Sequence, residues 1–286
     1  MPLDRATFAL PVGEVHALVG GDRTAPPLVY LHGFPDHPPT ATPFLEALAR
    51  THRVVAPWLR GYAPSPRGYA PSPRVGPYDI ETLAADASAL IDQLGGQADV
   101  VGHDWGGAIT YTLCAQSPAR VRRAVTLAIP HPSTFLRSLA YSQQWKKSWY
   151  MALFQLPGAG FLAAARDLAL IDRLWRAWSP NLTLDPARRA ELHACLAHSL
   201  PAPLEYYRAM LRPFTTLVHR VRQADARIAT PLLQLHGADD GCIVPPTDAD
   251  GRWFAARVLE VVPNVGHFLH IEAPVAIAAR VTRWLA

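Results

Sequence analysis

The chain has 286 residues, of which 50% are hydrophobic, and its formal net charge at pH 7 is +4. This length allows one large α/β domain or a core with an inserted subdomain. Basic residues are scattered among acidic ones, which indicates ordinary solvated surface and excludes a nucleic-acid footprint. No stretch approaches 18 apolar residues and residues 1–10 lack a basic, apolar leader, so neither a membrane span nor a signal peptide is expected. Three widely spaced cysteines without a C-x-x-C pattern predict no disulfide framework, no zinc site and a reducing cytoplasm.

The first hundred residues predict alternating strands and helices. Apolar runs predict strands at residues 27–31 and 53–56. A Gly/Pro-rich loop follows the first of them. A short helix is expected at residues 43–50, with Thr42 as its N-cap. After Asp79, a second expected N-cap, apolar residues recur at helical spacing until the glycine pair at 95–96.

A tandem repeat interrupts this pattern. Residues 60–66 have the sequence Arg-Gly-Tyr-Ala-Pro-Ser-Pro, and residues 67–73 repeat it. So much proline excludes a helix or a central strand. We predict a surface loop with one tolerated extra heptad, and favour that interpretation over a lip covering an active site.

The sequence 99–107, Asp-Val-Val-Gly-His-Asp-Trp-Gly-Gly, is the stretch around which the chain is organised. It predicts the end of a buried strand, a turn and the start of a helix, with Asp104 on the turn. Gly102 and Gly106 permit the sharp strand-to-helix bend of a nucleophile elbow. The same pattern fits a helix N-cap and, less well, a phosphate-binding turn. The hypothesis of a nucleophile therefore depends on partners elsewhere in the chain.

The first part of the chain resembles the core of an α/β-hydrolase, and in particular the epoxide hydrolases of that superfamily. The resemblance lies in the order of its elements: strand, His-Gly-Phe-Pro loop, helix, strand, Arg-Gly-Tyr loop, helix, strand and Gly-His-Asp-Trp-Gly-Gly. The resemblance implies a mostly parallel sheet flanked by helices, with an inserted helical cap. It also implies an acid and a histidine after later strands, in that order.

Both partners are present in the sequence. A buried strand at residues 231–236 precedes an acid loop, in which the family spacing selects Asp240, with Asp239 as the alternative. A last strand at residues 258–262 precedes His267, which matches the family's base, while His270 falls inside the following helix. The resemblance assigns the oxyanion hole to the backbone N–H groups of Phe34 and Trp105.

An aspartate nucleophile implies attack on carbon. Its carboxyl group has an ordinary pKa of about 4, so Asp104 is an anion at neutral pH without help from a base. Attack would form an alkyl ester on Asp104, which water activated by His267 and Asp240 would hydrolyse. Neither step needs a metal or an organic cofactor, and the expected partners are a small apolar epoxide and water.

The resemblance places the core at residues 1–131 and 230–286 and the cap at residues 132–229, where no clear strand run occurs. In the family, two cap tyrosines donate hydrogen bonds to the epoxide oxygen. Matching contexts place them at Tyr150 and Tyr207. Because adjacent helical residues point about 100° apart, we expect at most one of Tyr206 and Tyr207 in the cavity.

Two other hypotheses remain open. Haloalkane dehalogenases share the aspartate but commonly have Asn where this chain has Phe34, although Trp105 matches their halide-binding tryptophan. Fluoroacetate dehalogenases carry Arg after the nucleophile and a Trp near the position of Tyr150, and at these positions this chain has Trp105 and Tyr150. A hydrolase-fold binding protein without activity is the third possibility, and an intact Asp104, Asp240 and His267 set argues against it.

Overall fold

The computed structural model describes residues 2–62, 76–213, 215 and 225–286. Its eight-stranded sheet has the order β1-β2-β4-β3-β5-β6-β7-β8. From β4 to β8 neighbouring strands are parallel, whereas β1 pairs with β2 and β2 with β4 in antiparallel fashion. The expected mostly parallel sheet flanked by helices is confirmed. The strands are β1 Asp4–Leu10, β2 Gly13–Gly20, β3 Pro27–Leu31, β4 Arg53–Pro57, β5 Ala98–His103, β6 Val121–Leu127, β7 Leu232–Gly237 and β8 Arg257–Val262.

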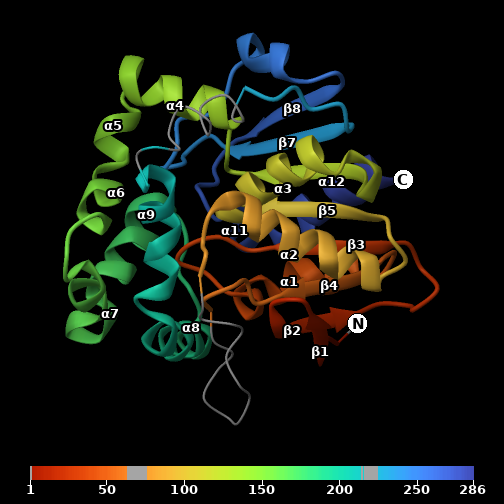
Figure 1. Cartoon of the computed structure of the whole chain (residues 1–286), viewed down its shortest axis with the longest axis horizontal. Helices are drawn as coiled ribbons and strands as arrows, with labels where there is room; N and C mark the ends of the chain where they lie inside the picture. The colour runs from red at the N-terminus through yellow and green to blue at the C-terminus, as the bar shows by residue number, and fades with distance from the viewer. Residues whose placement is uncertain (1, 63–75, 214, 216–224) are drawn as a thin grey trace.

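Helices flank the sheet (Figure 1), and those that precede β6 connect its parallel strands. The flanking helices are α1 Thr42–Leu48, α2 Ile80–Gln93, α3 Trp105–Gln116, α11 Leu269–Glu272 and α12 Pro274–Leu285. Helix α2 packs against α3, and α1 packs against α12. Every residue of β5 and β7 is buried, as expected for central strands covered on both faces.

Between β6 and β7 the described residues form helices (Figure 1). These inserted helices lie together beyond one edge of the sheet, and backbone bonds to Trp178 in α7 tie them to the loops that follow β7 and β8. They are α4 Pro132–Tyr141, α5 Gln144–Lys147, α6 Trp149–Phe154, α7 Ala159–Trp178, α8 Pro186–Ser199 and α9 Glu205–Leu211, and α7 is broken by non-helical backbone at residues 165–168. None of the described helices combines the length and the apolar character needed to cross a bilayer.

The order of the strands positions the site. Because β3 lies beside β5, the loop after β3 meets the turn after β5 at the carboxyl edge of the sheet. The loops after β7 and β8 open at the same edge, since these strands are parallel to β5. This edge is where open α/β sheets bind ligands.

Some local expectations differ from the structure. Thr42 is the first residue of α1 rather than its N-cap, because a short 3-10 helix, Pro38–Ala41, runs directly into α1 and leaves Ala41 at the cap position. The amino-terminal hairpin of β1 and β2, and the strand β6, were not predicted. Of the tandem repeat, residues 63–73 lie outside the described part of the chain, so the prediction of a surface loop there remains a prediction.

The Asp79 cap gives a test of the fold. Its carboxylate accepts hydrogen bonds from the backbone N–H and the hydroxyl of Thr82, each at 3.0 Å. We expect Asp79→Ala to lower the free energy of unfolding by about 1 kcal/mol, measured by urea unfolding, because the first turn of α2 loses its cap. Asp79→Asn retains an acceptor and serves as the control. An equal loss in both variants would contradict the capping role.

Candidate active site

Asp104 occupies the turn between β5 and α3 in a strained backbone conformation. Its φ is 51° and its ψ is −116°, in a region that residues with a side chain rarely adopt. The position is that of an N-cap, yet the side chain makes no capping hydrogen bond. The capping hypothesis therefore leaves the carboxylate unexplained, and strain of this kind is typical of functional turns.

The two glycines of this turn are required by close backbone approaches. A Cβ at Gly102 would lie 2.2 Å from the carbonyl oxygen of Gly106, and one at Gly106 would lie 2.0 Å from that of Leu31. Both distances are far inside van der Waals contact. The glycine spacing that identified the turn in the sequence thus has a steric cause.

The carboxylate of Asp104 is buried and held from the loop after β3. The residue is 5% exposed, so the carboxylate lies within the protein rather than standing free above the sheet. Its Oδ1 accepts a hydrogen bond from the backbone N–H of Phe34 at 2.9 Å. The N–H of Trp105 makes no such bond among the described residues. The structure therefore brings one of the two expected oxyanion donors onto the carboxylate.

His267 lies between two carboxylates. Its Nδ1 is 2.9 Å from Asp240 Oδ2, and its Nε2 is 3.6 Å from Asp104 Oδ2. The backbone N–H of His267 donates to the carbonyl oxygen of Trp178 in α7, which helps to fix the turn that carries the ring. The three residues expected in the order nucleophile, acid and histidine are thus brought together at the edge of the sheet.

The acid loop distinguishes the two neighbouring aspartates. Asp239 is exposed and accepts a 3.4 Å bond from the Asn181 side chain, away from His267. Asp240 is buried, and its Oδ1 accepts backbone N–H groups of Cys242 and Ile243 at 2.7 and 2.8 Å. These two bonds orient Oδ2 toward the histidine.

Sequence reasoning missed a second histidine on the same acid. His236, the penultimate residue of β7, has its Nε2 3.0 Å from Asp240 Oδ2. Its signal in the sequence is a polar residue inside a mostly apolar strand, a feature that Gln234 of the same strand shares. The buried Asp240 therefore faces two imidazoles as well as two amides.

The electrostatics of the site couple these groups. Burial on its own lowers the pKa of His267, but the charges of Asp240 and Asp104, with their hydrogen bonds, outweigh it and raise the pKa to about 10. Burial conversely raises the pKa of Asp240, but His267 and His236 reverse the sign and hold it well below its usual range. The resting site therefore contains an imidazolium between two carboxylates at neutral pH.

The expected tyrosines lie near Asp104, on two inserted helices. Tyr150 in α6 and Tyr207 in α9 are 3% and 2% exposed, with ring centroids 5.7 Å apart. The Tyr150 hydroxyl lies 3.4 Å from the Cys242 sulfur, whereas the Tyr207 hydroxyl has no hydrogen-bond partner among the described residues. Burial raises both phenol pKa values well above 10, so both are neutral donors.

We expected at most one of Tyr206 and Tyr207 to enter the cavity, and both residues belong to its lining. Each packs edge-on against the Trp105 ring, at centroid distances of 5.5 and 5.1 Å. Their hydroxyls differ, however. That of Tyr206 donates to the carbonyl oxygen of Arg60 at 2.6 Å, which leaves only the Tyr207 hydroxyl available for a ligand.

Asp104, Tyr150 and Tyr207 line a mostly apolar cavity of about 370 Å³. This volume is within the range of small-molecule sites. Its other walls come from α3, α4, α9 and the loop after β6. A buried anion, two neutral hydroxyl donors and a coupled histidine thus converge on one pocket.

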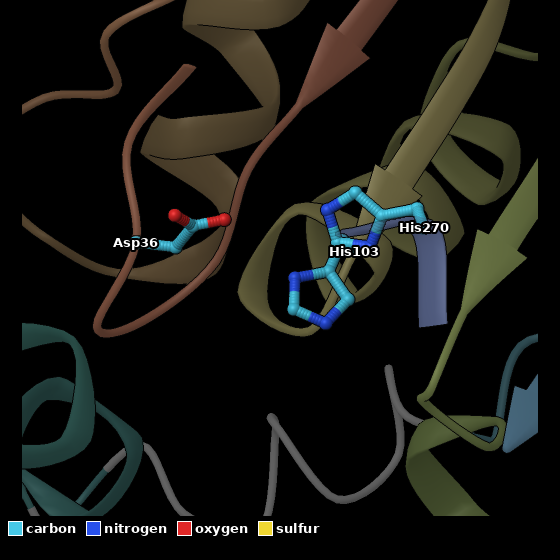
Figure 2. A group of neighbouring side chains, drawn as sticks. All are labelled: Asp36, His103 and His270. Atoms are coloured by element: carbon cyan, nitrogen blue, oxygen red, sulfur yellow. The ribbon is translucent and has the colours of Figure 1, made fainter. Parts of the chain in front are cut away.

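Beside His267 lies a second polar cluster, formed by Asp36, His103 and His270 (Figure 2). Each offers a potential ligand atom within 4.8 Å of the others, and each has one buried side-chain atom without a hydrogen-bond partner among the described residues. His103 also bonds through Nε2 to the backbone carbonyl of His267 at 3.0 Å. One carboxylate and two imidazoles could hold a divalent ion or an ordered water. Sequence reasoning did not predict this cluster.

This fold and this buried Asp-His-Asp arrangement define a hydrolase of the α/β class. A family model described as the alpha/beta hydrolase fold matches residues 26–274. The chain therefore belongs to the α/β-hydrolase fold family and is a hydrolase.

Named relatives refine this assignment. Epoxide hydrolase 3 of Xenopus tropicalis is 30% identical over 273 residues, 91% of this chain and 71% of that protein. Epoxide hydrolase 1 of Caenorhabditis elegans is 25% identical over 285 residues, 95% of this chain and 68% of that protein. The crystal structure of epoxide hydrolase VrEH1 from Vigna radiata is 25% identical, with a TM-score of 0.80, and the match covers 99% of this chain and 98% of that one. The resemblance to epoxide hydrolases is confirmed.

The raised pKa of His267 predicts a pH-dependent stability. The folded protein keeps a proton that the unfolded chain loses above pH 6.5, so this stabilisation is full below pH 6.5 and is lost as the pH rises toward about 10. We expect the difference in free energy of unfolding between wild type and His267→Gln to shrink over this range. Urea unfolding of both proteins across the range measures it, and a difference independent of pH would contradict the raised pKa.

Proposed function

We propose that this hydrolase opens epoxides to vicinal diols through an ester on Asp104. The observation that carries the proposal is the unpartnered, buried Tyr207 hydroxyl in the same cavity as a buried carboxylate. An epoxide needs both groups at once: an anion to attack carbon and a neutral donor for the departing oxygen. The names of the relatives described above support the same reaction.

In the first step, Asp104 Oδ2 forms a bond to an epoxide carbon while that carbon's bond to oxygen breaks. The oxygen takes a proton from Tyr207, assisted by a hydrogen bond from Tyr150. Asp104 Oδ1 becomes the ester carbonyl and stays bonded to the Phe34 N–H. Esterification removes the charge of Asp104, which is one cause of the high His267 pKa. His267 then becomes acidic enough to return the proton to the tyrosinate.

In the second step, neutral His267 takes a proton from a water molecule that attacks the ester carbonyl. The oxyanion forms on Oδ1, where the Phe34 amide is already in place, and the Trp105 N–H is the second donor we propose. Collapse of the intermediate breaks the acyl–oxygen bond, the departing alkoxide takes a proton from the regenerated carboxyl group, and the diol leaves. The site ends as it began, with Asp104 ionised and His267 protonated.

The inserted helices contribute to this chemistry, and we propose that residues 132–229 form a cap on a core of residues 1–131 and 230–286. Tyr150 and Tyr207 come from the cap, whereas Asp104, Asp240 and His267 come from the core. The reaction would therefore take place between the two parts. Enclosure there strengthens hydrogen bonds to the departing oxygen, because little water competes.

The paired tyrosines give a direct test. Replacing Tyr150 and Tyr207 together by Phe removes both donors but keeps the rings, so diol formation should fall at least about 100-fold with an unchanged thermal unfolding midpoint. Tyr206→Phe, whose hydroxyl bonds to a backbone carbonyl instead, is the matched control and should keep its activity within a few fold. Diol formation is measured on an epoxide panel and halide release on matched haloalkanes. Full activity of the double variant, or halide release without diol, would favour a dehalogenase.

The order of the steps gives a second test. Because Asp104 is ionised without a base, His267→Gln should still form the ester but fail to hydrolyse it. We expect one stoichiometric burst of substrate loss, and a protein heavier by one substrate on the peptide that contains Asp104. Asp104→Ala should show neither. An unmodified His267→Gln protein, or an adduct found only on a cysteine, would show that the nucleophile is assigned wrongly.

A further inference from the structure

The cavity extends along α3 away from Asp104, as the burial of the α3 residues that line it indicates. Asp104 lies at the amino end of this helix, and Ala108, Thr112 and Ala115 line the cavity at helical spacing as half-buried residues. Gln116, at the far end of the row, is exposed. Residues three to four positions apart share one face of a helix, so the row forms a continuous floor that leads away from the nucleophile. Its members are small, which leaves room above them.

The walls of this channel are apolar. Phe135 and Leu136 come from α4, and Met210 and Leu211 come from α9. Gln116 is polar where the lining reaches the carboxyl end of α3, whereas Glu81, at the start of α2, lies at the same edge of the sheet as Asp104. A ligand group lying in the channel would therefore be hydrocarbon, and its far end would meet solvent.

The opposite side of the nucleophile is closed. Phe34, Phe154 and Trp178 are buried and do not belong to the described lining of the cavity. Their rings fill this side by contact: Phe34 and Phe154 have centroids 5.4 Å apart, and Trp178 lies 4.9 Å from Tyr150 and 5.3 Å from His267. A chain directed away from α3 would have to displace packed aromatic rings.

On the basis of the proposed function, we infer that the substrates are terminal epoxides with one long apolar chain. The ring occupies the closed end between Asp104 and Tyr207, and the chain lies along α3 toward Gln116. An epoxide with long chains on both ring carbons would direct the second chain into the wall of Phe34, Phe154 and Trp178.

The length of the channel determines how long a substrate chain must be to reach Thr112. Thr112 lies eight residues beyond Asp104, or about 12 Å along the helix axis. An extended chain advances about 1.2 Å per bond, so the ten carbons beyond the ring of a twelve-carbon terminal epoxide span about 12 Å. A four-carbon epoxide stops well short of Thr112.

Two isomers test the inference in the wild-type enzyme. The twelve-carbon terminal epoxide and the twelve-carbon epoxide with its ring at the centre of the chain have the same composition and apolar content. We expect kcat/KM for diol formation to be at least about tenfold higher for the terminal isomer. Equal values would overturn the inference and leave epoxide hydrolysis intact. Failure to hydrolyse any epoxide would overturn the proposed function, and the inference with it.

A variant then locates the chain. A helical side chain leans toward the amino end of its helix, so Thr112→Phe would place a ring across the channel between Thr112 and Ala108. We expect kcat/KM for the twelve-carbon terminal epoxide to fall at least about tenfold, while the four-carbon terminal epoxide changes by less than about twofold. Ala279→Phe, on the exposed face of α12, is the control for added aromatic bulk. An equal effect on both epoxides, or on neither, would show that the chain does not lie along α3.

Discussion

The structure depends on keeping one carboxylate ionised inside the protein. A buried charge is costly unless fixed partners replace water, and Asp104 has two: the Phe34 N–H at 2.9 Å and the His267 imidazolium at 3.6 Å. Both partners come from loops far away in the sequence. They can reach Asp104 only because β3 is paired with β5 and because β7 and β8 follow in the same parallel direction.

The charges around His267 extend this argument beyond the triad. With Asp104 and Asp240 ionised, the single imidazolium leaves the centre with a net negative charge. Burial raises the pKa of the nearby Asp36 carboxyl to about 7, and burial lowers that of His103 to about 3. His103 is therefore neutral near pH 7, whereas Asp36 is about half ionised there and adds its charge to the field of Asp104, Asp240 and His267.

The sequence sufficed for the parts of the site that lie on the chain at fixed distances from buried strands. Asp104, Asp240 and His267 each follow an apolar run that can be recognised without a structure, and the resemblance to epoxide hydrolases selects Asp240 and His267 within their loops. The amino-terminal hairpin could not be recognised in this way, because most of β1 is exposed and its pattern is not strongly apolar. Strand β6 was not recognised because Arg122 and Arg123 interrupt its apolar run. In the structure, Arg122 pairs with Asp99 at the start of β5.

His236, His103, His270 and Asp36 lay beyond sequence reasoning for a different reason. Each follows or occupies a predicted element, but its role comes from contacts between elements: His236 with Asp240, and His103 with the carbonyl of His267. A polar residue in an apolar run shows that a partner must exist, since buried polar groups are rarely left unpaired. It does not show which loop supplies the partner. Only the packing of the strands settles that.

The two adjacent tyrosines show where geometry adds chemistry to a helical pattern. The 100° phase between neighbours separates their hydroxyls, although both residues line the cavity and the Trp105 indole packs edge-on against both rings. The two tyrosines differ in the hydrogen bonds of their hydroxyls. The Tyr206 hydroxyl donates to the backbone carbonyl of Arg60, whereas the Tyr207 hydroxyl has no hydrogen-bond partner among the described residues. A donor that is buried but unbonded costs free energy in the resting protein. A ligand oxygen that accepts a hydrogen bond from Tyr207 recovers that cost, so this hydroxyl favours a ligand with an oxygen acceptor in the cavity that Asp104 also lines.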